Sequence, residues 1–253
     1  MRDSLTFFSP LEQFEIVSLI PISIFNFNIS VTNSTLFICI SIFICLSWIS
    51  LSFYKNLIIP SHWQLLKENF YDLTANVVRD NLGSKGEVYF PFIFTLHLFL
   101  LFCNLIGMVP YSFTVTSHII FTFSLALLIF IGINIIGFKT HGLLFFSLFL
   151  PRGVPLIIVP LLITIEFLSY IVKVFTLSIR LFANMTSGHT LLKIIAGFAW
   201  TMLSAGGLLA FFHVIPLLLL LALIGLELAI AGLQAYVFTL LTCIYLNDVL
   251  DLH

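Results

Sequence analysis

Long stretches of this chain are apolar and uncharged. Residues 16–54, 88–138 and 194–226 contain no Asp, Glu, Lys or Arg, and the one charged residue between 194 and 247 is Glu227. About 20 consecutive apolar residues span a bilayer as a helix, whereas barrel strands alternate polar and apolar positions over about ten residues. That alternation is absent from the sequence. The pattern therefore predicts an all-α integral membrane protein.

We expect a single membrane domain with about five membrane helices. The predicted shorter spans cover 35–54, 90–110 and 118–138, and the last two helices cover 156–200 and 208–247. At 1.5 Å per residue, the last two would measure roughly 67 and 60 Å, about twice the 30 Å hydrocarbon thickness. We therefore expect these two helices to be strongly tilted, or broken.

An amphipathic helix is predicted over residues 61–80. Ser61 and Gln64 form a capping box after a proline, which indicates where the helix begins. Apolar residues then recur at spacings of three and four, while charged residues fill the opposite face. This pattern is typical of a helix that lies on the membrane surface, and a solvated linker helix is the alternative.

Composition excludes several classes of function. Hydrophobic residues make up 60% of the chain and charged residues 8%, against about 25% charged residues in soluble domains. The net charge of −1 comes from 10 basic and 11 acidic residues, so no nucleic-acid partner is expected. The four cysteines stand alone, without the paired spacing of metal or redox sites. We therefore expect neither a metal nor a cofactor.

The charges in the loops predict the orientation of the chain. Six basic residues fall in the loops 55–89 and 139–153, which lie on the same side of a five-span protein, namely Lys55, Lys67, Arg79, Lys85, Lys139 and Arg152. The opposite side carries only Arg2. The positive-inside rule then places the C-terminus inside and the N-terminus outside. The first residues resemble neither a transit peptide nor a signal peptide. We therefore expect the chain to insert into the membrane without a cleaved targeting sequence, in a bacterium or an organelle.

The polar residues within the last two helices are candidates for function, because a charge at the centre of a membrane helix costs about 2.5–3.5 kcal/mol on insertion scales. Glu166, Lys173 and Arg180 are seven residues apart, which places them on one stripe of the helix. Asn184 lies one turn beyond Arg180. His189 is nine residues beyond Arg180, on the opposite side and roughly 13 Å along the axis.

In the last helix, Glu227 and Gln234 are also seven residues apart and face the same way. Small residues around them allow another helix to approach closely, namely Gly225, Ala229, Ala231 and Gly232. Glu166 and Lys173 could form an ordinary ion pair. Arg180 has no acidic residue one turn away and Glu227 has no basic one, so these two either meet each other or meet partners outside this chain.

Four segments of the sequence are similar to one known family. They are SPLEQFEI (9–16), FCNLIGMVPYSFTVTSH (102–118), SIRLFANMTSGHTLLKI (178–194) and GLELAIAGLQAYVFTLLTCIYLND (225–248). They resemble the a-subunit family of rotary F-type ATP synthases in its mitochondrial form. The resemblance covers nearly the whole chain, and the segments around Arg180 and Gln234 are highly specific.

The resemblance implies proton translocation through two offset aqueous half-channels, past a rotating ring of c subunits. By position, Arg180 matches the family's stator arginine, which faces the carboxylates of the ring, and Gln234 and Asn184 are its polar neighbours. Glu227 and His189 match the acid and the histidine of the proton-uptake half-channel.

The same resemblance places Glu166 and Asp248 toward the exit on the matrix side. It implies a non-catalytic subunit of the mitochondrial inner membrane, with its N-terminus in the intermembrane space and its C-terminus in the matrix. The expected partners are the c-ring, peripheral-stalk and other Fo subunits, and membrane lipids, and the expected translocated ion is H⁺.

Two other classes of membrane protein are alternatives to this family. A respiratory-complex subunit that binds haem or quinone would need facing histidines at matched depth, and His97 with His118 would lie at different depths. A secondary transporter of an anionic solute could use Arg180 to bind a carboxylate. Transporters usually contain internal repeats, and no symmetry is found between residues 35–138 and 156–247.

Overall fold

The structure, a computed structural model, describes residues 9–24, 27–28, 30–50, 61–109, 112–149 and 158–250. Within these ranges the chain is almost entirely helical, which confirms the predicted all-α class. Five helices are long and apolar enough to cross a membrane. They are α1 (Asn33–Ser50), α3 (Phe90–Gly107), α4 (Ile119–His141), α5 (Val159–Ala205) and α7 (Val214–Leu250).

Other elements connect or precede these helices. The helix α2 (His62–Leu82) follows α1, and α6 (Gly207–Phe212) lies between α5 and α7. The 3-10 helices are η1 (Pro10–Phe14), η2 (Gly83–Val88), η3 (Val115–Ser117) and η4 (Gly142–Phe149). Near the N-terminus, β1 (Ser18–Ile20) pairs with β4 (Val31–Thr32), and β2 (Ser23–Ile24) pairs with β3 (Phe27–Asn28), both antiparallel.

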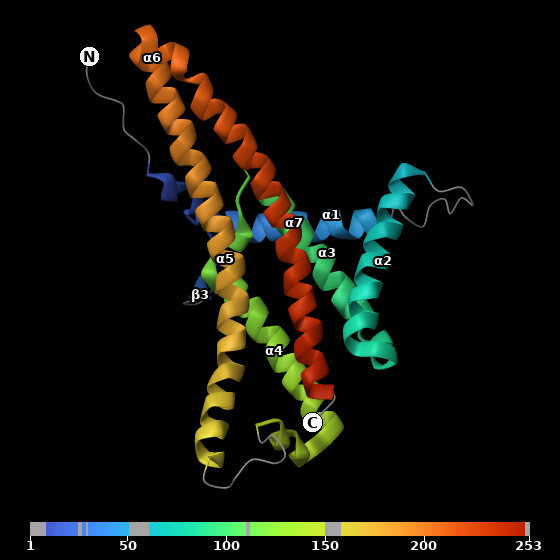
Figure 1. Cartoon of the computed structure of the whole chain (residues 1–253). Coiled ribbons are helices and arrows are strands. Elements are labelled where there is room, and N and C mark those ends of the chain that lie inside the picture. The colour runs from blue at the N-terminus through green and yellow to red at the C-terminus, as the bar shows by residue number, and fades with distance from the viewer. Residues whose placement is uncertain are drawn as a thin grey trace.

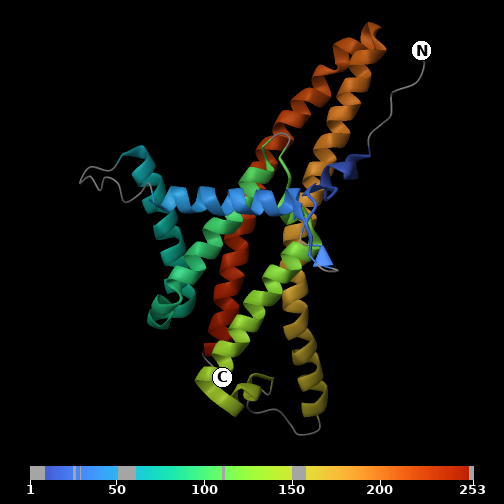
Figure 2. The same cartoon turned by 180° about the vertical axis from the view of Figure 1, so that it is seen from behind.

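The two long helices dominate the arrangement. Figure 1 shows α5 and α7 running the length of the molecule and joined by α6 at one end, with α3 and α4 packed beside them. The helix α1 runs across the direction of α5 and α7, as Figure 2 shows from behind. At 1.5 Å per residue, the 47 residues of α5 and the 37 residues of α7 measure about 70 and 55 Å. Because α1 crosses them, all three helices cannot be parallel to one membrane normal.

Two breaks precede α7, one between the two long helices and one within the single helix that was expected over 208–247. Gly206 and Gly207 have φ values of +68° and +63°, a left-handed conformation that glycine adopts without steric strain. The chain therefore turns directly after Ala205. A second interruption follows at His213, so that α7 begins at Val214. The predicted ends of the first two spans, at 54 and 110, lie outside the described residues.

The apolar face of α2 has two parts. Val77 and Val78 are buried in the core that α2 shares with α3 and α7, and the ring of Phe70 packs against that core. Near the start of the helix, Trp63 and Leu66 are instead exposed. The Ser61 hydroxyl accepts a hydrogen bond from the Gln64 N–H at 3.4 Å, at the predicted start of the helix. The helix is thus attached to the protein along one half and exposes apolar side chains along the other.

Close packing of α3 against α7 fixes the position of the last helix. Ala231 and Ala235 of α7 are completely buried, and their small side chains allow the two backbones to approach. Two polar residues of α3 bond across the same seam. Asn104 Nδ2 donates to the Ala231 carbonyl at 3.2 Å, and His97 Nδ1 lies 3.3 Å from Thr239 Oγ1. Polar contacts within an apolar seam fix the register of the two helices.

The contact between α4 and the end of α7 generates a stability prediction. A Cβ atom on Gly137 would lie 2.5 Å from Val249 Cγ1 and 2.6 Å from Phe145 Cε2, whereas a Cβ on Gly132 of the same helix has no neighbour within 4 Å. Overpacking of this kind costs about 1–3 kcal/mol. We expect Gly137→Ala to lower the thermal denaturation temperature of the protein in membranes. Gly132→Ala should leave it unchanged or raise it, and equal behaviour of the two variants would contradict the described packing.

Candidate functional site

Arg180 lies on a face of α5 that the other described elements leave exposed. Leu177, Ser178 and Leu181 are buried against the other helices, while Ile179 and Arg180 are exposed. The Arg180 guanidinium makes no hydrogen bond or ion pair with any residue that the structure describes. A guanidinium stays protonated in proteins. Its counter-charge must therefore come from outside the described part of this chain.

Asn184 and Gln234 join the two long helices one turn beyond Arg180. Asn184 Nδ2 donates a hydrogen bond of 2.9 Å to Gln234 Oε1. Gln234 is buried between the helices, and Asn184 is exposed on the same face of α5 as Arg180. The structure thus brings together two of the residues that the sequence singled out, beside the exposed guanidinium.

Glu227 lies on α7 with its carboxyl group directed at α5. A Cβ atom on Gly188 would lie only 2.6 Å from Glu227 Oε1, so any larger residue at this position would have to push the carboxyl group aside. Glu227 is buried, and neither of its carboxyl oxygens has a hydrogen-bond partner among the described residues. Buried polar atoms without partners are rare and commonly mark sites for water.

His189 lines the same cavity as Glu227. The cavity has a volume of about 240 Å³ and its wall also includes Asn184, Gly188 and Met108. His189 Nε2 is buried and, like the Glu227 carboxyl group, lacks a partner in the described part of the chain. Arg180 is not among the residues that line this cavity. An acid, an imidazole and space for water therefore meet on one side of α5, apart from the guanidinium.

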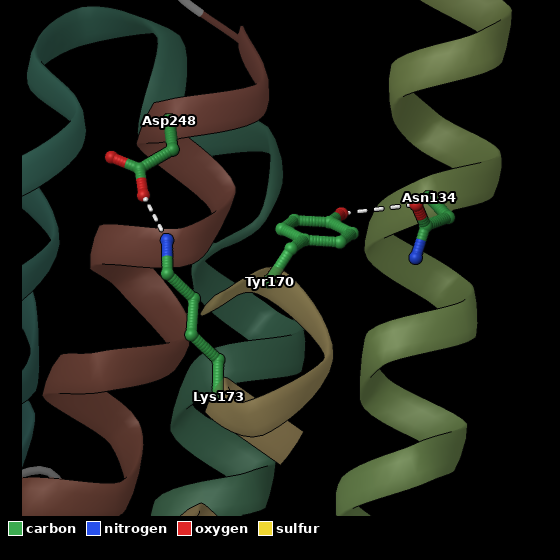
Figure 3. Close-up of polar contacts among 4 residues, drawn as sticks. All are labelled: Asn134, Tyr170, Lys173 and Asp248. Atoms are coloured by element: carbon green, nitrogen blue, oxygen red, sulfur yellow. Dashed lines mark hydrogen bonds and ion pairs between the residues drawn. The ribbon is translucent and has the colours of Figure 1, made fainter. Parts of the chain in front are cut away.

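At the other end of the helix pair, Asp248 of α7 pairs with Lys173 of α5 (Figure 3). Lys173 Nζ lies 3.1 Å from Asp248 Oδ2 and 5.0 Å from the centre of the Tyr245 ring. The sequence suggested an ion pair between Glu166 and Lys173, but Lys173 pairs with Asp248 instead. Glu166 is exposed and makes no ion pair or hydrogen bond with the residues that are described.

Sequence reasoning missed the polar contacts around this ion pair. Figure 3 shows Tyr170, one turn before Lys173, pointing to Asn134 of α4, and its hydroxyl donates to Asn134 Oδ1 at 3.0 Å. Asn134 was recognisable as an amide within an apolar helix. No local pattern pairs Lys173 with Asp248, because 75 residues separate them.

The histidines considered for haem are engaged in other contacts. His97 bonds to Thr239 within the seam of α3 and α7, whereas His118 stacks on Phe113 with ring centres 5.1 Å apart. Within the described ranges, no group of three His, Cys, Asp or Glu side chains could hold a metal ion.

Comparison with known proteins gives one consistent result. The profile of the family described as ATP synthase A chain matches residues 34–247. The chain is 80% identical over 245 residues to ATP synthase subunit a of Chondrus crispus, covering 97% of each chain. It is 51% identical over 249 residues to ATP synthase subunit a of Marchantia polymorpha, with 97% of this chain and 99% of the relative covered. To ATP synthase subunit a-2 of Arabidopsis thaliana it is 51% identical over 252 residues, covering 97% of this chain and 72% of the relative.

Proposed function

Because the chain belongs to the ATP synthase A chain family, we propose that it carries protons to and from a ring of c subunits through two offset half-channels separated by Arg180. The chain is a multi-pass membrane protein and a non-catalytic subunit of the Fo sector. The observation that carries the proposal is the exposed guanidinium of Arg180, which has no counter-ion among the described residues, on the unpartnered face of α5.

Arg180 acts as a fixed charge. A guanidinium cannot release its proton, so it relays none, but it keeps a passing ring carboxylate ionised and prevents direct leakage between the half-channels. Asn184 and Gln234 extend the polar surface beside it, and their mutual hydrogen bond holds both amides in place. Gly225 and Ala229 are exposed on α7 and leave room for ring helices to approach.

Glu227 and His189 form the proton-uptake site. Imidazole exchanges protons near neutral pH, and a carboxyl group in a buried site can accept one. Both groups line one cavity, and both present polar atoms that lack a partner in the described part of the molecule. Water in this cavity would connect them. Protons that reach Glu227 then pass to the ring on the Arg180 side of the helix pair.

Glu166 and Asp248 serve the exit half-channel. Asp248 follows Glu227 by 21 positions on α7, a separation of about 30 Å along the helix. The two regions are therefore well separated along α7, although the tilt of the helix makes their difference in membrane depth smaller than this distance. Each proton that crosses the full membrane gains about 2.3 kcal/mol per 100 mV of potential. Lys173 holds the Asp248 carboxylate near the end of α7.

The proposed setting is the mitochondrial inner membrane. In it, α5 and α7 are strongly tilted, since each is far longer than the 30 Å hydrocarbon layer and α1 runs across them. The basic loops place the C-terminus in the matrix and the N-terminus in the intermembrane space. The exposed apolar half of α2 lies on the matrix surface of the bilayer. Peripheral-stalk subunits, other Fo subunits and lipids cover the remaining faces.

The role of Arg180 is tested with Arg180→Ala in the reconstituted synthase. We expect proton flux coupled to ATP synthesis or hydrolysis to be lost, because the other cation on that stripe of the helix, Lys173, is already paired with Asp248, while the subunit still assembles. Proton pumping into vesicles measures this. Arg79→Ala, which removes an exposed guanidinium from α2, is the matched control and should keep normal flux. Normal ATP synthesis by Arg180→Ala would disprove the assignment.

The proton-uptake site predicts a second effect, at Gly188. In Gly188→Ala the new methyl group would displace the Glu227 carboxyl group, which lies 2.6 Å from the position of that Cβ. We expect proton uptake to slow about tenfold, the effect of roughly 1.4 kcal/mol. Gly197→Ala on the same helix meets nothing within 4 Å and should match the unsubstituted protein in the same pumping assay. Equal rates for the two variants would exclude Glu227 from the path.

A further inference from the structure

A second and larger cavity adjoins the proton-uptake site. It has a volume of about 840 Å³ and lies between the halves of α5 and α7 nearest α6, beside the end of α3. His189 and Met108 line this cavity as well as the smaller one that contains Glu227. One water molecule takes about 30 Å³ of liquid, so the larger cavity has room for a hydrated path to His189.

One wall of this cavity comes from the N-terminal segment. Gln13 lies on η1, which packs against α5, and Figure 1 shows this segment in dark blue beside that helix. Local bonds give η1 a defined shape. The Ser9 hydroxyl accepts from the Leu11 N–H at 3.4 Å, and Glu12 Oε1 accepts from the Ser9 N–H at 3.2 Å. The Gln13 side chain is thus presented from a capped turn.

Gln13 has the same feature as His189 and Glu227. Its Nε2 atom is buried and lacks a hydrogen-bond partner among the residues described. A buried amide N–H without a partner costs about 1–3 kcal/mol, and water in the adjoining cavity would supply the missing acceptor. The two cavities therefore connect three polar groups that lack a partner among the described residues. The larger cavity joins Gln13 to His189, and the smaller one joins His189 to Glu227.

The chemistry of the cavity wall suits a path for hydrated protons. His189 and Lys193 are the titratable residues among those that line the cavity, and no carboxylate is included. A lysine is ordinarily already protonated at neutral pH, so His189 is the residue of this wall that can accept an arriving proton. An amide does not titrate in this range, so Gln13 can orient water without binding the proton itself.

We propose that η1 forms the outer wall of the proton-uptake half-channel and that Gln13 is a positioning residue, which holds the water that delivers protons to His189. The inference rests on the proposed function. It adds a binding site for ordered water, formed by an N-terminal turn that lies outside the transmembrane helices.

The test uses side-specific labelling of thiols in the reconstituted synthase. Cys39 is the exposed one of the four native cysteines, so the background is Cys39→Ser. In this background, Gln13→Cys is treated with a membrane-impermeant methanethiosulfonate. The reagent is added on the side of the membrane opposite the part of the synthase that binds nucleotides. We expect passive proton flux to fall at least about threefold and to recover when a reducing agent removes the adduct. Reagent on the other side should have no effect.

Leu11→Cys is the matched control, because Leu11 belongs to the same turn, is 61% exposed and does not line the cavity. Its thiol should react from the same side without changing the flux. An unreactive Gln13→Cys, or a labelled one with normal flux, would overturn the inference.

A second pair of variants tests the hydrogen bond itself. Gln13→Asn keeps an amide and should retain most of the flux, whereas Gln13→Leu should reduce it to the level of the labelled thiol. Equal flux in both variants would also overturn the inference. Arg180→Ala is measured in parallel. If that variant abolishes coupled flux while every Gln13 variant is normal, the proposed function stands and only the role of Gln13 fails.

Discussion

Arg180 places a positive charge on the exposed face of an apolar membrane helix, and this charge limits what can lie against α5. Arg180 is exposed on α5, and nothing in the described part of the chain pairs with it. Such a charge costs about 2.5–3.5 kcal/mol on insertion scales, and an anion supplied by a partner would offset that cost. The chain is therefore incomplete by itself, which is consistent with a subunit that works against a ring of carboxylates.

Helix geometry separates this charge from the groups that can exchange protons. Glu227 and His189 line a cavity that does not include Arg180, although all three belong to the same two helices. The position of α7 is fixed by its seam with α3, where two buried alanines permit close approach. Asp248 lies at the far end of α7, beside Lys173. In the proposed mechanism, the length and tilt of α5 and α7 place the two polar regions toward opposite sides of one membrane.

The sequence predicted the helices well, because uncharged apolar runs leave few alternatives in a membrane. It also predicted that His189 faces away from Arg180, since that follows from helical periodicity alone. The sequence suggested that small residues of the last helix let another helix approach closely. In the structure these residues fall into two groups, because Ala231 packs inside this chain whereas Gly225 and Ala229 are exposed.

Contacts between distant segments could not be predicted in the same way. The pairing of Lys173 with Asp248 depends on how α5 packs against α7, and no local pattern encodes it. Likewise, the wall that Gln13 contributes to a cavity depends on where the N-terminal turn docks on α5. The left-handed backbone at Gly206 and Gly207 and the short helix α6 that follows were not predicted from the sequence.

In the proposed mechanism, the Arg180 face of α5 contacts a ring of c subunits. Ala183 lies one turn beyond Arg180 and is exposed on that face. A photoreactive benzoylphenylalanine in place of Ala183, irradiated in the assembled synthase, tests the contact directly. The account predicts a covalent adduct with a c subunit, identified by mass spectrometry. Adducts formed only with lipid or with other subunits, and none with a c subunit, would contradict this contact.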